Sequence, residues 1–99
     1  MSPIEYLASI SAESASAFQA LRKSALAAGP LDHTTCELVV IATMAVTGAE
    51  AGFKVHARRL IKDGVELAAM RHAVLVTIAA STTFSQVSDA LRWLDEAAA

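Results

Sequence analysis

Cysteine is almost absent from this sequence, which holds one, Cys36, among 99 residues. A single thiol cannot form an internal disulfide or a Cys-x-x-Cys redox pair. A lone cysteine in an apolar stretch is more often a small buried side chain than a reactive thiol. The sequence therefore argues against a disulfide-stabilised fold and against chemistry that needs two sulfur atoms.

Long apolar runs are also missing. A membrane-spanning helix needs about 20 consecutive apolar residues, and the best runs, 38–46 and 73–80, are far shorter. The N-terminal stretch contains Glu5 and no basic start, unlike a secretory signal peptide. We therefore expect no membrane partner and a cytoplasmic protein.

The sequence has no large excess of positive or negative charge, and it has no cluster of residues with the spacing of a metal-binding or phosphate-binding site. Eight Lys and Arg stand against ten Asp and Glu, for a net charge of −2, which provides no basic patch for nucleic acid. The three histidines and Cys36 do not have the spacing of a metal site. No phosphate-binding glycine loop or nucleophile elbow occurs. We expect no nucleic-acid partner, no metal and no cofactor.

Apolar residues, in contrast, are abundant. They make up 55% of the chain, and the mean hydropathy is +0.46. A chain of this length buries only roughly 60 to 70% of its unfolded surface. Much apolar surface should remain exposed on one copy, so we expect a homo-oligomer.

The two prolines, the four glycines and the high alanine content predict an all-α fold. We expect one domain over residues 1–99, a compact bundle of five to six helices. Segment 38–46 is apolar on nearly every side and should be the buried central helix. The first expected helix begins at Pro3, and the second follows Ser11 and ends at Gly29. The next two run from Asp32 to about Thr47 and from Glu50 to Asp63. A fifth begins near Glu66 and has Ile78 on its apolar face, and the last runs from Val87 to Ala97.

Three polar residues are candidates for chemistry. Glu37 precedes the apolar segment, and His56 lies on the same helical face as Phe53 and Leu60. Taken alone, a solvent-facing carboxylate and a hydrogen-bonded core histidine are the commoner situations. Arg59 lies one turn after His56 and could hold a carboxylate, cap its helix or form a salt bridge.

Residues 37–79, ELVVIATMAVTGAEAGFKVHARRLIKDGVELAAMRHAVLVTIA, resemble the core of the carboxymuconolactone decarboxylase and alkylhydroperoxidase D-like superfamily. The upstream ALAAGPLDHTTCELV extends the resemblance, so we place the core motif at 30–80. The resemblance implies the helix-turn-helix core of that superfamily and a trimer or hexamer. In its peroxidase branch, a glutamate is followed by Cys-x-x-Cys-x-x-x-His, with the glutamate and histidine nineteen residues apart. Glu37 and His56 have that separation, whereas Ala49 and Gly52 replace the cysteines.

This split favours proton chemistry over sulfur chemistry. Peroxide reduction needs a thiolate and a resolving thiol, and Cys36 lies beside Glu37, whose negative charge disfavours a thiolate. The decarboxylase branch implies an acid/base enzyme, a decarboxylase or lyase acting on a small carboxylic acid or lactone. His56 would then move the proton, Glu37 would orient it, Arg59 would bind a carboxylate, and Ala49 and Gly52 would leave room for substrate.

Two alternatives remain open. The chain could be a non-catalytic oligomeric binding or structural protein, in which Glu37 and His56 form a buried hydrogen bond between helices. The least favoured alternative is antioxidant activity of the peroxidase or peroxiredoxin type, through Cys36 and an external thiol.

Overall fold

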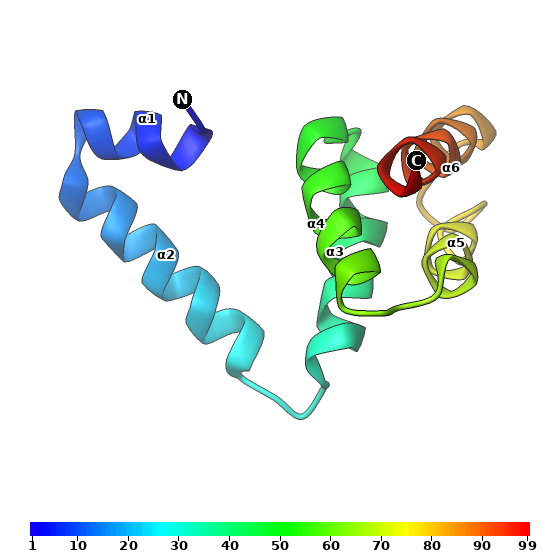
Figure 1. The fold of residues 1–99 in the computed structure, drawn as a ribbon, viewed down its shortest axis with the longest axis horizontal. Helices are drawn as coiled ribbons and strands as arrows, with labels where there is room; N and C mark the ends of the chain where they lie inside the picture. The colour runs from blue at the N-terminus through cyan, green and yellow to red at the C-terminus, as the bar shows by residue number, and fades with distance from the viewer. The chain divides into compact units, whose positions relative to one another are not determined.

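The computed structural model describes all residues from 1 to 99 and contains six helices and no β-strand (Figure 1). This confirms the all-α class and the expected number of helices. The helices are α1 (Pro3–Ile10), α2 (Ala12–Ala27), α3 (His33–Thr47), α4 (Glu50–Lys62), α5 (Leu67–Leu75) and α6 (Phe84–Ala98). None of them combines the length and apolar character needed to span a bilayer.

The contacts divide the chain into two compact units, Met1–His33 and Thr34–Ala99. The single domain expected over residues 1–99 therefore stays a prediction, and each unit is described by itself. The first unit consists of α1 and α2, which contact each other. Side-chain caps set both helix starts, since Ser2 Oγ accepts from Glu5 N (3.3 Å) and Ser11 Oγ accepts from Ser14 N (3.1 Å).

The first unit buries little of its apolar surface. Ala15 is the only buried residue of α2, and α1 has none. The large apolar side chains Phe18 and Leu21 of α2 are 54% and 69% exposed. The apolar side of α2 is thus left largely uncovered within its own unit.

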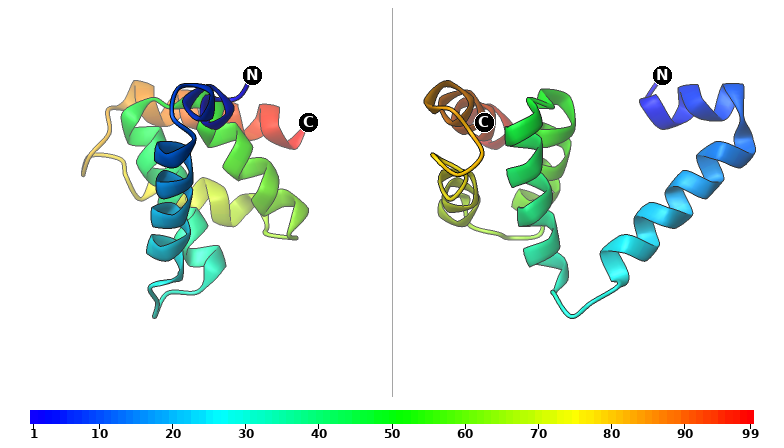
Figure 2. Two further views of the ribbon diagram at one scale, coloured as in Figure 1. Left: turned by 90° about the vertical axis from the view of Figure 1, so that its left-hand side faces the viewer. Right: turned by 180° about the vertical axis from the view of Figure 1, so that it is seen from behind.

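The second unit is a four-helix bundle with the main hydrophobic core. Helices α3 and α4 run in opposite directions from the short turn that joins them, and α6 contacts both α4 and α5 (Figures 1 and 2). Phe53 of α4 packs edge-on against Trp93 of α6, with ring centroids 5.4 Å apart. The buried core consists of Ile41, Ala45, Phe53, Ala57, Leu60, Met70, Val74, Val87, Ala90 and Leu94.

Two expectations, one about α3 and one about α5, need correction. α3 is not buried all round, because only Glu37, Ile41 and Ala45 are buried and Val39 is 51% exposed. α5 ends at Leu75, so Ile78 lies beyond the helix.

The last helix begins at Phe84 rather than at Val87. Its start is set by a capping box in which Thr83 Oγ1 accepts from Gln86 N (3.2 Å) and Gln86 Oε1 accepts from Thr83 N (2.8 Å). Residues 84–86, which precede the expected start at Val87, are therefore part of the first turn of α6.

A lysine connects α4 to α6 on the outside of this bundle. Lys54 Nζ donates to Glu50 Oε2 at 2.7 Å and also contacts Glu96. The hydrogen bond to Glu50, then that to Glu96, raises the pKa of Lys54 above 10.5. Both carboxylates stabilise the charged amine only in the folded chain.

We predict that Lys54→Met lowers stability at neutral pH, and that the loss depends on pH. The pKa of Lys54 is higher in the folded chain than in the unfolded chain, so its contribution is complete below about pH 10.5 and declines above it. Urea unfolding across pH 7 to 12 should show the two proteins converging at alkaline pH. Lys62→Met, at an exposed lysine of the same helix, is the control; an equal effect of both substitutions would contradict the assignment.

Candidate functional site

The turn between α3 and α4 brings Glu37 and His56 together. Gly48 adopts a positive φ of 74°, which a residue with a side chain rarely does. Ala49 then begins α4: its N–H donates to Met44 O (3.0 Å), and its carbonyl accepts from Phe53 N (2.9 Å). The chain reverses direction here, so the second turn of α3 faces the second turn of α4.

Glu37 and His56 form a direct side-chain contact. Glu37 Oε2 lies 2.6 Å from His56 Nδ1, across nineteen residues of sequence. The Glu37 side chain is 5% exposed and that of His56 is 13% exposed. The structure therefore brings together the two residues that the sequence singled out. Their side chains form a hydrogen bond between α3 and α4.

The chemistry of the pair follows from its donors and acceptors. An ionised carboxylate carries no proton, so Nδ1–H of His56 donates to Oε2. This arrangement fixes the ring and leaves Nε2 as the nitrogen that can exchange a proton with a ligand. No buried side-chain nitrogen or oxygen lacks a partner, and Nδ1 is the His56 nitrogen that is hydrogen-bonded, which places Nε2 at accessible surface.

The two positions that replace cysteines differ in their surroundings. Ala49 is exposed at the start of α4, whereas Gly52 is half-buried. A Cβ built on Gly52 would lie 3.2 Å from Met44 Cε and 3.3 Å from Met44 Sδ. The room that we expected beside Gly52 is thus occupied by the thioether of Met44, a residue that the sequence analysis did not select.

Arg59 and Cys36 lie near the pair in sequence and differ in their exposure. Arg59 is exposed, and its backbone carbonyl accepts from Asp63 N (2.9 Å) at the end of α4. Cys36 is half-buried, and adjacent helical residues point about 100° apart. No group of three or more His, Cys, Asp or Glu side chains is placed to hold a metal ion.

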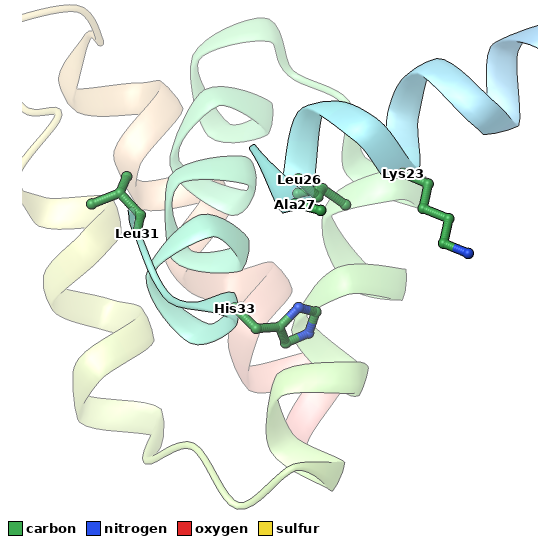
Figure 3. Close-up of a pocket in the computed structure, with 5 residues that line it drawn as sticks. All are labelled: Lys23, Leu26, Ala27, Leu31 and His33. Carbon is green, nitrogen blue, oxygen red and sulfur yellow. The ribbon is translucent and has the colours of Figure 1, made fainter. Parts of the chain in front are cut away.

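Two shallow hollows lie in the first unit. The one in Figure 3 is lined by Lys23, Leu26, Ala27, Leu31 and His33. Lys23 and His33 are exposed there, so neither is removed from water, and we assign no chemistry to this hollow. The other is apolar and is lined by Pro3, Ile4, Leu7 and Phe18.

We predict that the Glu37–His56 contact stabilises the fold more than a surface ion pair does. His56→Ala should lower the free energy of unfolding by about 1 to 3 kcal/mol, because the buried carboxylate loses its donor. Glu37→Ala should have a similar cost, and the double variant should cost less than the sum. Urea unfolding of the four proteins measures this coupling.

The matched control is the exposed pair of Arg71 and Asp95, whose Nη2 and Oδ1 atoms lie 2.9 Å apart. Its coupling should be about 0 to 1 kcal/mol. Equal coupling in the two pairs would show that burial adds nothing to the contact of Glu37 with His56.

Comparison with known proteins identifies the family. Residues 12–96 match the model of the carboxymuconolactone decarboxylase family. A search of curated proteins and a search of solved structures each gave no match. The matched segment begins with α2 and ends within α6, so it includes both members of the Glu37–His56 pair. Because this match extends over most of its length, the chain belongs to the carboxymuconolactone decarboxylase family.

Proposed function

We propose that this protein is an acid/base enzyme of the decarboxylase or lyase type, acting on a small carboxylic acid or lactone. The observation that carries the proposal is the 2.6 Å contact between Glu37 Oε2 and His56 Nδ1. A carboxylate that holds one imidazole nitrogen leaves the other directed and available, as general acid/base catalysis requires. Family membership supports the same class of chemistry.

In the proposed reaction, His56 supplies a proton from Nε2. The bond to the departing carboxylate carbon breaks, carbon dioxide leaves, and the electron pair stays on the substrate, where a neighbouring carbonyl delocalises it. Transfer of the Nε2 proton to carbon then completes the shift of the double bond, and solvent reprotonates His56. Glu37 stabilises the imidazolium and fixes the ring, so it acts as a positioning residue.

Arg59 is the proposed carboxylate-binding group. It lies one helical turn after His56, and its side chain is exposed and forms no ion pair within the chain. A guanidinium can hold a carboxylate through two parallel hydrogen bonds. This role requires the Arg59 side chain to turn toward the ligand.

We predict that His56→Gln reduces turnover about 10²- to 10⁴-fold, because a proton-transfer group contributes that much. Glu37→Gln should have a smaller effect, and Arg59→Ala should mainly raise KM. The assay is release of carbon dioxide from carboxymuconolactone and from short β-keto acids. His72→Gln, at an exposed histidine of α5, is the control.

Unchanged turnover of the folded His56→Gln variant would refute the proposed roles. The absence of turnover by the wild-type protein with any of these acids would favour a non-catalytic oligomeric protein of the same fold. The filling of the space beside Gly52 by Met44 is the observation that supports that second candidate.

Peroxidase activity of the peroxiredoxin type is the least supported function. Ala49 and Gly52 carry no sulfur, and Cys36 would need an external thiol to complete a cycle.

We further propose that the protein assembles into a homo-oligomer, a trimer or hexamer. Phe18, Leu21, Val76 and Phe84 are each more than half exposed on a single copy. Each of the two units thus leaves large apolar side chains exposed, and association with further copies is a common way to cover such side chains.

Light scattering should give a mass of at least three chains of 10.3 kDa. Leu21→Glu should shift the protein toward smaller species, whereas Arg22→Glu, at the neighbouring position of α2, should not. A monomer at micromolar concentration would refute assembly.

A further inference from the structure

The interface between α3 and α4 has a second contact beside the Glu37–His56 pair. Met44 follows Glu37 by seven residues, two turns of helix, so both lie on the same side of α3. Gly52 precedes His56 by four residues and lies on the same side of α4. The interface therefore pairs Glu37 with His56 at one level and Met44 with Gly52 at the next.

The second contact depends on the missing side chain of Gly52. A Cβ at that position would lie 3.2 to 3.3 Å from the end of the Met44 side chain, closer than most Cβ contacts. Gly52 thus makes the space into which the thioether fits. Cβ positions four residues apart on a helix are about 5 to 6 Å from each other, so the position that the thioether contacts lies one turn of α4 before His56.

The Met44 side chain is suited to define the size of a neighbouring site. It is half-buried and packs against the core without being enclosed by it. Methionine has three rotatable bonds, so its terminal atoms can shift to fit an adjacent group. The thioether occupies the space beside Gly52, on the side of α4 that also carries His56.

We infer that Met44 is the specificity-determining residue of the site: its thioether fills the space beside Gly52 and restricts the acids that reach His56 Nε2 to short ones. This inference rests on the proposed function, because it takes His56 as the group that meets the acid. It concerns the length of the carbon chain, which neither the family match nor the Glu37–His56 contact specifies.

The test measures binding without requiring turnover. Straight-chain carboxylates from acetate to hexanoate are titrated into protein with labelled histidines, and the imidazole resonances are followed by NMR at fixed pH and ionic strength. His72 is exposed and belongs to α5, so its resonance reports non-specific effects. In the wild-type protein, the His56 response should weaken beyond the shortest acids.

Met44→Ala should reverse this dependence on length. Each further methylene that becomes buried in the enlarged space should strengthen binding roughly fourfold. Gly52→Ala should act in the opposite direction, because its methyl group pushes against Met44, and it keeps the test available if Met44→Ala does not fold. Leu91→Ala, at another partly buried residue packed against the same core, is the matched control and should keep the wild-type dependence.

The outcomes separate the two hypotheses. Equal dependence on chain length in the wild-type, Met44→Ala and Gly52→Ala proteins would overturn the role of Met44 while leaving the proposed acid site in place. No response of His56 to any acid, in any of these proteins, would overturn the proposed function and the role of Met44 together.

Discussion

The contact between Glu37 and His56 is the constraint on which the rest of the site depends. Glu37 is the only ionisable residue among those that the structure buries. A buried carboxylate is costly unless it is paired and hydrogen-bonded, so α3 and α4 must keep the rotation about their axes that brings Oε2 to Nδ1. The positive φ of Gly48 and the backbone hydrogen bonds of Ala49 set the turn that makes this rotation possible. A structural demand and a chemical arrangement therefore coincide in one hydrogen bond.

The substitutions at the cysteine positions change the chemistry of the site without opening it. A thiol at position 52 would bring a sulfur atom from α4 into the interface; here the sulfur in that place belongs to a thioether from α3. A thioether cannot act as a thiolate nucleophile or form a disulfide, which removes the two steps of peroxide reduction. The Glu37–His56 hydrogen bond involves neither of these two positions, so it is present beside a packed and unreactive neighbour.

Much of the fold could be predicted from the sequence because local signals are strong. Pro3, Ser11 and Gly29 mark helix ends by capping and turn chemistry, and the observed helices agree with them. The start of α6 was missed because Thr83 and Gln86 appeared to be part of a polar loop rather than a capping box. The pairing of Glu37 with His56 came from the family resemblance, since helical periodicity alone cannot say which faces of two helices meet. Met44 could not be found in this way, because a methionine in an apolar run looks like any core residue.

Helix α3 is buried on one side and exposed on another, and the two sides relate to the Glu37–His56 pair and to the proposed oligomer respectively. One side of this helix carries Glu37, Ile41 and Ala45 into the bundle, while Val39 remains 51% exposed on another side. The expectation of full burial came from apolar residues on nearly every side, and a single copy covers only one of those sides. In the proposed oligomer, a neighbouring copy would cover the outer side without touching the pairing of Glu37 with His56. Assembly and proton transfer would then use different sides of the same helix, so a substitution at Val39 can weaken association while the hydrogen bond to His56 stays intact.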